Sequence, residues 1–179
     1  MDRFEKYLEE YRRPIYSYVL RLVRDPHLAE DITQETFVRL YKEMDNIRDS
    51  TASAWIYRVA RNLVTDYSRK KKPVLFTVLK GGMRPTDTAD GRESVDFAGN
   101  QQQPPAESYE NELQLLVAQA IERMSPKYRD PLILCDMEHL TYEQAADVLN
   151  CSVKTVSARL HRAREFLSTF LKKHAEAEN

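Results

Sequence analysis

A short segment near the C-terminus carries the side chains whose types and spacing suggest chemistry. Ser152 is a residue type that often begins a helix, because its hydroxyl accepts a bond from a backbone N–H group. Behind it, one helix face carries Lys154, Ser157, His161, Arg162 and Glu165. Cationic and hydrogen-bonding groups on such a face can hold phosphates and read base edges in a major groove. The pattern favours binding to DNA, with a solvated surface helix as the alternative.

The residues before this helix resemble the first half of a helix-turn-helix. Thr141-Tyr142-Glu143-Gln144 has the form of a capping box, in which Thr141 and Gln144 satisfy each other's backbone N–H groups. The opposite face of the second helix is apolar and should pack inward, with Val153, Val156, Leu160, Ala163 and Leu167 at spacings of three and four. Residues 141–171 therefore predict a helix-turn-helix, with its turn at Asn150-Cys151-Ser152.

Motifs for other chemistry are missing from the sequence. All four glycines fall within residues 81–99, so no Gly-rich phosphate loop lies between a strand and a helix. There is no HExxH motif and no nucleophile elbow, and an enzyme is not expected. Cys135 and Cys151 lack CxxC spacing and are expected to be reduced thiols. No cofactor or metal is predicted.

Charge is unevenly distributed along a chain whose net charge is only −1. Residues 58–72 contain six basic residues and one acidic residue, and residues 152–174 contain the same numbers. Two basic helices predict two separate contacts with a polyanion. The N-terminus lacks the basic and apolar regions of a signal peptide, and no apolar run approaches 18 residues. We therefore expect a cytoplasmic protein without membrane insertion.

Three amphipathic helices are predicted in the N-terminal part. The first has Phe4, Leu8, Tyr11, Ile15, Tyr18 and Leu22 on one face and ends at Asp25-Pro26. The second begins near His27 and carries Leu28, Ile32, Phe37, Leu40, Tyr41 and Met44. A polar loop is expected over residues 45–53. The third helix has Trp55, Val59, Leu63 and Tyr67 on its inner side, and a basic run ending at Pro73 closes it.

The composition changes after this basic run. Residues 74–107 are rich in Gly, Pro, Asp, Thr and Gln and predict a flexible linker, in which Val74 to Leu79 could be a strand, a docking segment or a loose connector. Helical periodicity returns with Leu113, Leu116, Val117, Ala120, Ile121 and Met124. Ser125-Pro126 should begin the next helix, which Pro131 should kink. The expected fold is all-α, with two small helical domains (1–73 and 108–179) joined by the linker (74–107).

Five segments in this order resemble the extracytoplasmic-function group of bacterial RNA polymerase sigma factors. The first domain contributes residues 28–37, similar to the family's AEDLTQETF, residues 55–63, similar to WLYRIARNL, and Asp66-Tyr67 before basic residues, similar to DYLRR. In the second domain, residues 125–129 resemble LPPKYR and residues 153–164 resemble VGTVKSRLHRAR. The resemblance covers both domains and leaves only the linker outside.

The resemblance implies that the first domain binds core RNA polymerase and the promoter minus-10 element, while the second reads the minus-35 element. The implied polymerase contacts are Asp31, Gln34, Glu35 and Arg39. The implied minus-10 contacts, including a pocket for a flipped base, are Asn46, Arg48, Asp49, Ser50, Arg58, Arg61, Asn62, Thr65, Arg69 and Lys70. The implied minus-35 contacts are Lys154, Thr155, Ser157, Ala158, Arg159, His161 and Arg162. An anti-sigma factor is a further implied partner.

The second basic helix departs from the family pattern at three positions. Lys154 stands where glycine is common, and Ser157 and Ala158 stand where a basic residue and a serine are common. One cation is lost and one gained, so the basic surface moves toward the helix start. Two competing hypotheses remain open: a regulator that binds duplex DNA without polymerase, and an adaptor whose basic helices pair with acidic protein surfaces.

Overall fold

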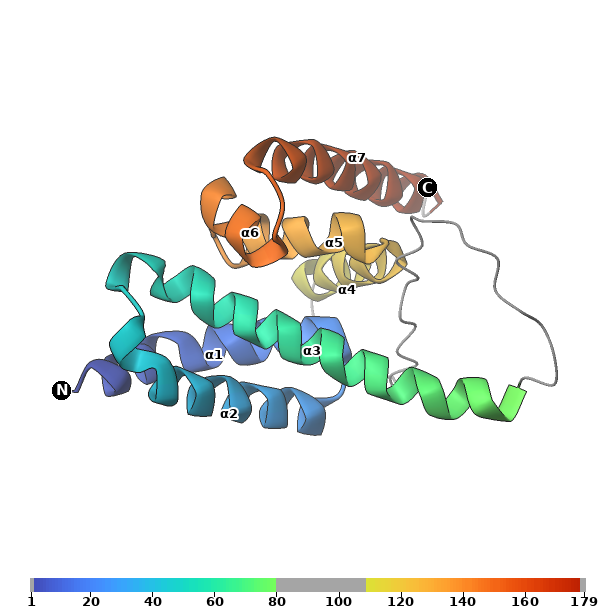
Figure 1. Ribbon diagram of the computed structural model, residues 1–179. Coiled ribbons are helices and arrows are strands. Elements are labelled where there is room, and N and C mark those ends of the chain that lie inside the picture. Colours follow the sequence, from blue (N-terminus) through green and yellow to red (C-terminus); the bar gives the residue numbers. More distant parts are fainter. Residues whose placement is uncertain (1, 80–108, 178–179) are drawn as a thin grey trace. The chain divides into compact units, whose positions relative to one another are not determined.

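The computed structural model describes residues 2–79 and 109–177, with side chains over residues 2–69 and 112–175. Every element within these ranges is a helix, which confirms the expected all-α class (Figure 1). The elements are α1 (Arg3–Val23), α2 (Pro26–Glu43), the 3-10 turn η1 (Met44–Asn46), α3 (Asp49–Leu79), α4 (Tyr109–Arg123), α5 (Pro126–Leu132), the π-helical turn η2 (Ile133–Met137), α6 (Tyr142–Leu149) and α7 (Val153–Ala177). Most of the predicted linker lies outside the described residues.

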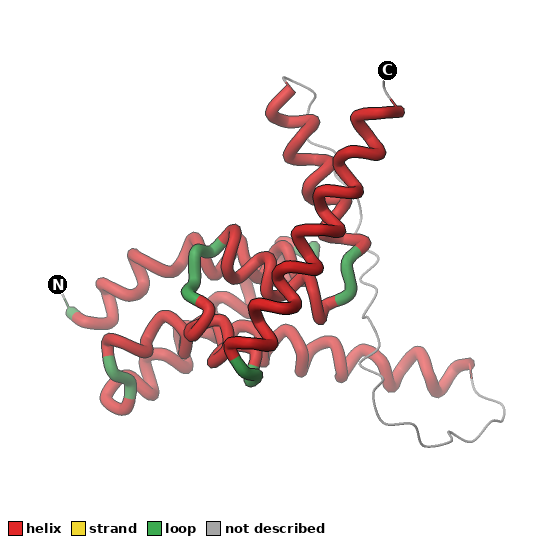
Figure 2. The backbone as a smooth tube through the Cα atoms, turned by 90° about the horizontal axis from the view of Figure 1, so that it is seen from above, coloured by secondary structure: helices red, strands yellow, loops and turns green. Residues whose placement is uncertain are grey.

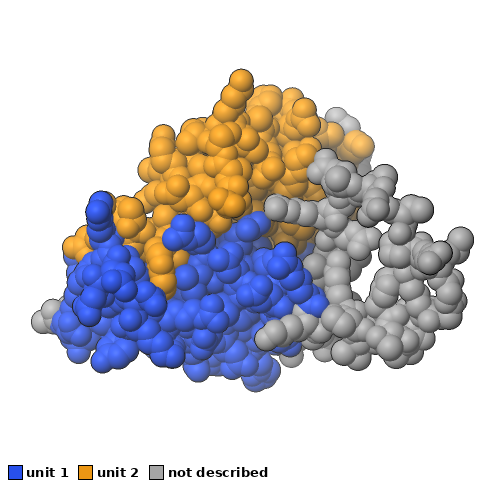
Figure 3. Space-filling model, viewed as in Figure 1, with its two compact units in different colours: residues 1–48, 56–99 blue, residues 49–55, 100–179 orange. Residues whose placement is uncertain are grey.

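The chain divides into two compact units (Figure 3). The first comprises residues 1–48 and 56–99, and the second comprises residues 49–55 and 100–179. Two helical units agree with the expected fold class, and each has its own buried apolar residues.

The first unit is built on the packing of α1 against α2, with α3 completing the core (Figure 1). Ile15, Tyr18 and Val19 of α1 and Leu40 of α2 are fully buried. The ring of Tyr18 meets that of Tyr57 in α3 edge to face, with centroids 5.3 Å apart. Edge-to-face aromatic pairs stabilise a core beyond their buried area. The shared three-helix core predicted from periodicity is therefore confirmed.

The break between α1 and α2 follows from local sequence chemistry. Arg24 ends α1 in the left-handed conformation, with φ of 56°. The Asp25 carboxylate then accepts hydrogen bonds from the backbone N–H groups of His27 and Leu28, at 3.0 and 3.1 Å. Pro26 occupies the first helical position, where its missing N–H costs nothing. The predicted boundary at Asp25-Pro26 is confirmed.

Both ends of α3 differ from the prediction. The helix begins at Asp49, so the expected polar loop over residues 45–53 is reduced to η1 and two connecting residues. Asp49 and Ser50 are residue types that favour a helix start, and this tendency overrides their general preference for loops. At the other end, α3 continues to Leu79 past the predicted stop at Pro73. A proline removes one backbone hydrogen bond, and Pro14 within α1 is accommodated in the same way.

The buried side of α3 is also displaced from the predicted one. Trp55, Val59, Leu63 and Tyr67 are only half-buried. The deeply buried positions in this part of α3 are Ile56, Tyr57, Ala60, Val64 and Ser68. Most of these lie one residue further along the chain, which turns the inner face by about 100° around a helix. The helical spacing of the apolar residues was predicted correctly, but the buried face of α3 was wrong. The predicted stripe and the buried stripe both contain large apolar residues, so spacing alone did not distinguish them.

The second unit packs α4, α5 and α6 around α7 (Figure 2). Val156, Leu160 and Ala163 of α7 are fully buried, as predicted. Val153, expected on the same stripe, is 39% exposed. A helical side chain lies over the turn that precedes it, and the first residue of α7 has no such turn. Leu113 is likewise 54% exposed near the start of α4.

The helix-turn-helix is present as predicted. The Gln144 N–H donates to the Thr141 hydroxyl at 3.2 Å, while the Gln144 side chain accepts from the Thr141 N–H at 2.9 Å. Asn150 ends α6 in the left-handed conformation. The Thr155 N–H then donates to the Ser152 hydroxyl at 3.2 Å, which caps α7.

Pro131 interrupts the helix before this motif. Ser125 and Pro126 begin α5 as expected, although the Ser125 side chain makes no cap hydrogen bond. After Pro131 the chain changes from α-helical to π-helical geometry over Ile133–Met137. The predicted disruption is therefore a π-helical turn, which places Asp136 beside α7.

Candidate nucleic-acid interface

The predicted minus-35 residues share one side of α7. Lys154, Ser157, Ala158, His161 and Arg162 are exposed, whereas Thr155 and Arg159 are half-buried. The Thr155 hydroxyl lies 2.8 Å from that of Ser152, and His161 lies 3.6 Å from Glu165. This side of α7 presents cations and small side chains outward, opposite the buried Val156 and Leu160.

Arg162 is held by a residue from another helix. Its Nη1 donates to the hydroxyl of Tyr128 in α5 at 3.3 Å. This hydrogen bond lowers the pKa of Tyr128 from its usual value, against a smaller effect of burial, and nearby Lys127 lowers it further. The same contact raises the pKa of Arg162. Sequence analysis missed this pair because its members lie 34 residues apart.

Arg164 forms an ion pair within the second unit. Its Nε and Nη2 donate to the two carboxylate oxygens of Asp136 in η2, at 2.9 and 2.6 Å. This bidentate bond is the main reason that the pKa of Arg164 is raised. Arg164 matches the family's motif, yet its guanidinium holds α7 against η2.

Arg159 differs from both of these arginines. Its Nε is buried and has no hydrogen-bond partner among the described residues. Burying a donor without a partner is unfavourable, and a ligand acceptor that reached this group would relieve that cost.

The predicted minus-10 residues of α3 form a second polar face. Arg58, Asn62 and Arg69 are exposed, and Arg61 and Thr65 are half-buried. The Thr65 hydroxyl donates to the Arg61 carbonyl at 2.9 Å, so it is occupied within the helix. The side chain of Lys70 lies outside the described part of the chain. Arg58, Asn62 and Arg69 therefore offer two cations and an amide on one exposed surface.

The other predicted minus-10 residues lie where η1 leads into α3. Asn46, Arg48, Asp49 and Ser50 are all exposed. The Asn46 amide donates to the Glu43 carboxylate at 3.1 Å. Arg3 donates to the carbonyls of Met44, at 2.9 Å, and Ile47. The N-terminus of α1 therefore supports this connection, a contact that sequence spacing did not reveal.

The predicted polymerase-binding residues lie on the exposed side of α2. Asp31, Gln34, Glu35 and Arg39 are all exposed. Arg39 Nε lies 2.8 Å from Glu35 Oε1, and the Gln34 amide donates to Glu30 at 3.4 Å. Arg39 neutralises the charge of Glu35, so the negative charge that remains on this face of α2 comes mainly from Glu30 and Asp31.

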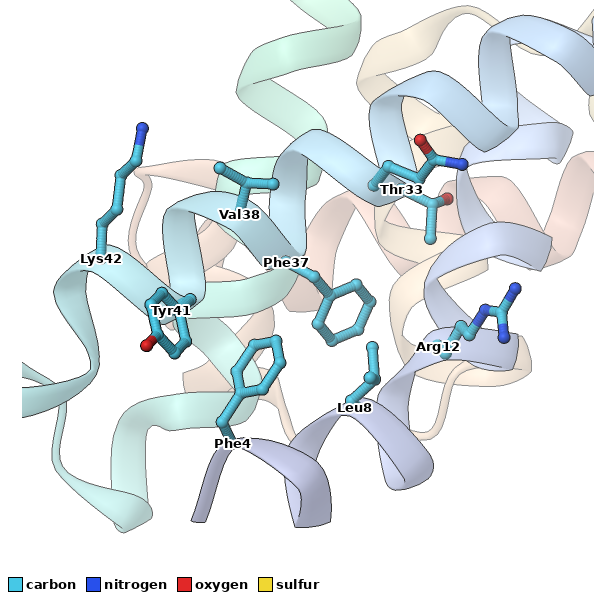
Figure 4. Close-up of a pocket in the computed structure, with 9 residues that line it drawn as sticks. Phe4, Leu8, Arg12, Thr33, Phe37, Val38, Tyr41 and Lys42 are labelled. Carbon is cyan, nitrogen blue, oxygen red and sulfur yellow. The ribbon is translucent and has the colours of Figure 1, made fainter. Parts of the chain in front are cut away.

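A shallow groove between α1 and α2 adjoins this face (Figure 4). It has a volume of about 490 Å³ and is lined mainly by apolar groups. Phe4 and Tyr41 meet edge to face on one side, with ring centroids 5.3 Å apart, and Phe37 and Leu8 continue the lining. Tyr41 is 67% exposed although its spacing predicted a buried position.

The described residues offer neither a metal site nor a membrane-spanning helix. No group of three or more His, Cys, Asp or Glu side chains there could hold a metal ion, and both cysteines are free thiols. None of the helices described is long and apolar enough to cross a membrane.

Together these features define an all-helical protein with a helix-turn-helix unit and a second helical unit that also carries an exposed basic face. The Sigma-70 region 2 family matches residues 7–74, and the Sigma-70 region 4 family matches residues 114–167. The first range contains the basic face of α3, and the second contains most of the helix-turn-helix. The family comparison therefore assigns the two polar faces to two regions of one kind of protein.

Curated relatives match nearly the whole chain. The ECF RNA polymerase sigma factor SigW of Bacillus subtilis is 32% identical over 167 residues, covering 93% of this chain and 87% of that protein. The sigma-H factor of Pseudomonas aeruginosa is 31% identical, covering 94% and 86%. SigE of Mycolicibacterium smegmatis is 28% identical over 98% of this chain, which spans 64% of its length.

Solved structures show the same fold. The sigma factor RpoE, in complex with the anti-sigma factor NepR from Bartonella quintana, has a TM-score of 0.65 at 22% identity, covering 94% of this chain and 96% of that one. CnrH, in complex with the cytosolic domain of CnrY, has a TM-score of 0.64 at 19% identity, covering 95% and 88%. This chain belongs to the ECF RNA polymerase sigma factors, which are transcription factors that support promoter recognition and initiation by RNA polymerase.

Proposed function

We propose that the two exposed basic faces divide promoter recognition between them. The face of α3 takes the minus-10 element, and the face of α7 takes the minus-35 element. The observation that carries this proposal is that each compact unit presents cations and polar groups opposite its own apolar core. Two modest contacts on one chain reinforce each other when both can be made at once. We propose domain boundaries at 1–73 and 108–179 for these two functions.

The minus-35 contact is assigned to the outer side of α7. Lys154, Thr155 and Ser157 near its N-terminus would meet phosphates, since the positive end of the helix dipole and the Lys154 cation both favour an anion there. Ala158, Arg159, His161 and Arg162 continue along the helix toward base edges. A bidentate arginine to guanine contributes about 1–3 kcal/mol of discrimination. Arg162 is exposed whereas Arg159 is half-buried, so Arg162 is the strongest candidate for such a contact.

The minus-10 contact is assigned to α3 and the connection before it. Arg58, Arg61 and Arg69, with Lys70, would hold the backbone of the separated strand. Asn62 and Thr65 offer side chains that hydrogen-bond to bases. Asn46, Arg48, Asp49 and Ser50 would surround a base that has left the stack, which must recover the lost stacking through new contacts.

Core polymerase is assigned to α2. Asp31, Gln34, Glu35 and Arg39 form a polar stripe on one face, and residues three and four apart on a helix lie side by side. A partner helix with basic side chains would complement the acidic members. Chemistry would remain with the polymerase, and the protein would act in the cytoplasm.

An anti-sigma factor is a further proposed partner. The support is the fold shared with the sigma factor RpoE, whose structure contains the anti-sigma factor NepR, and with CnrH, whose structure contains the cytosolic domain of CnrY. A protein that covered α2 or the outer side of α7 would prevent polymerase or promoter binding.

Transcription in vitro tests the proposed function. Core polymerase with the purified protein should initiate at a limited set of promoters from a random library, and sequencing the transcripts should reveal both elements. Arg58→Ala with Asn62→Ala should alter preference near minus 10, and Lys154→Ala should weaken binding at minus 35. A protein that binds its DNA site equally well without polymerase would support a conventional regulator. Binding to proteins that survives nuclease treatment, without promoter preference, would support an adaptor.

A further inference from the structure

Three arginines of α7 lie close together in sequence but differ in what their guanidinium groups can do. Arg164 uses Nε and Nη2 in a bidentate bond to Asp136. Arg159 has a buried Nε. Arg162 is exposed, and within the described residues only its Nη1 donates a hydrogen bond, to Tyr128. The Nε and Nη2 groups of Arg162 are therefore available to a ligand.

This arrangement suits the geometry of base recognition. Guanine offers two adjacent acceptors in the major groove, O6 and N7, and an arginine binds both with one edge of its planar fork. A hydrogen bond at Nη1 leaves the edge formed by Nε and Nη2 intact. It also restrains a long side chain that would otherwise lose rotational freedom on binding.

Tyr128 is itself well placed to provide this restraint. It is half-buried on α5, which packs against α7. Lys127 Nζ lies 5.7 Å from the centre of its ring, which is within the range of a cation–π interaction. The bond from Arg162 is also the main cause of the lowered pKa of Tyr128.

We propose that Tyr128 is a positioning residue, which holds Arg162 in the orientation that reads one base pair of the minus-35 element. The hydroxyl accepts from Nη1 and directs the remaining edge of the guanidinium outward from α7. Tyr128 contacts no DNA in this arrangement and sets selectivity through Arg162. The inference rests on the proposed minus-35 role of α7 and adds a residue from outside the helix-turn-helix.

The test uses the full chain assembled with core polymerase, and a promoter library randomised across the minus-35 element. Four variants are compared with the parent: Tyr128→Phe, Arg162→Ala, the double variant, and Tyr16→Phe as a matched loss of a tyrosine hydroxyl in α1. Base preferences are read by sequencing the transcripts. Thermal unfolding of each variant checks that it folds, and Tyr128→Phe keeps the aromatic ring while removing only the hydroxyl.

The expected result is specific to one position. Tyr128→Phe should reduce preference at a single minus-35 base pair by about two- to tenfold, as the loss of preorganisation of one side chain predicts. Arg162→Ala should reduce preference at the same base pair, and the double variant should match Arg162→Ala. The salt dependence of DNA binding should not change in Tyr128→Phe, because no charge is removed. Tyr16→Phe should behave as the parent.

Other outcomes overturn particular statements. If Arg162→Ala changes a preference and Tyr128→Phe does not, the positioning role is wrong while the minus-35 role stands. If Tyr128→Phe acts equally with and without Arg162, the hydroxyl works independently of the arginine and the proposal is also wrong. If Arg162→Ala alters no preference, both this inference and the assignment of Arg162 to base reading fail. Initiation at no promoter by the parent would instead refute the proposed function.

Discussion

Arg164 and Asp136 form a bidentate ion pair that joins α7 to the π-helical turn η2, with N···O distances of 2.9 and 2.6 Å. The pair connects the helix proposed to read DNA with the segment that follows Pro131. A planar guanidinium paired with both oxygens of a carboxylate resists rotation about the contact. The orientation of α7 within its unit therefore depends partly on a residue 28 positions earlier.

Breaking this pair should destabilise the second unit. Asp136→Asn removes the charge while keeping the shape, and we expect a loss of about 1 kcal/mol, since both side chains are partly exposed and screened by solvent. Urea unfolding followed by circular dichroism measures this change. Glu165→Gln is the control, because its 3.6 Å contact with His161 is highly exposed and should contribute little. Equal effects of the two substitutions would contradict a special role for the bidentate pair.

The capping box at Thr141 should determine the stability of α6. Thr141→Ala removes the acceptor for the Gln144 N–H and should cost about 1 kcal/mol. Hydrogen exchange should accelerate first at the amides of α6. Thr169→Ala serves as the control, because that hydroxyl only donates to the Glu165 carbonyl within α7. Faster exchange throughout the second unit, with none specific to α6, would argue against a local capping effect.

Arg3 should support promoter opening through the connection before α3. Arg3→Ala removes donors to the carbonyls of Met44 and Ile47 and should destabilise the first unit by about 1–2 kcal/mol. Strand separation near minus 10, measured by permanganate reactivity of thymines, should fall, while binding to the minus-35 element is retained. Lys6→Ala, an exposed change on the same helix, should leave both unchanged. A loss of minus-35 binding in Arg3→Ala would contradict this localised role.

Tyr128 should ionise at a lower pH than an ordinary tyrosine because Arg162 donates to its hydroxyl. A pKa lowered by folding adds stability that is fully present above the unfolded-state pKa, near 10, and is lost progressively as the pH falls through the lower folded-state value. The pair therefore adds no ionisation-linked stability at neutral pH. NMR titration of the Tyr128 ring carbon bearing the hydroxyl measures this pKa, which should rise in Arg162→Ala. An unchanged titration would show that the hydrogen bond does not persist in solution.

Local sequence patterns predicted the helices and several of their boundaries. Asp25 caps the start of α2, and Pro26, which has no N–H group, occupies its first position, so the two residues separate α1 from α2. Thr141 and Gln144 begin α6 through two reciprocal hydrogen bonds. These interactions join residues within a few positions, so residue type and spacing are sufficient to indicate them. The helical spacing of apolar residues likewise identified the buried face of α7. Val156, Leu160 and Ala163 form an apolar stripe, and the neighbouring faces are mainly polar, so the choice was unambiguous.

Tertiary packing decided what local patterns left ambiguous. On α3, Trp55 and Ile56 begin two neighbouring stripes that are both apolar, and tertiary packing, which includes the contact of Tyr57 with Tyr18 of α1, selects the one that is buried. The polar faces themselves were visible in sequence as exposed cations. The partners of individual cations were not, since Arg162 meets Tyr128 and Arg164 meets Asp136 only after the chain turns back on itself. Sequence alone determined the helices and the family, because these depend on short-range periodicity and motifs. The three-dimensional fold decided which arginines remain free to bind, because that depends on contacts between residues far apart in the chain.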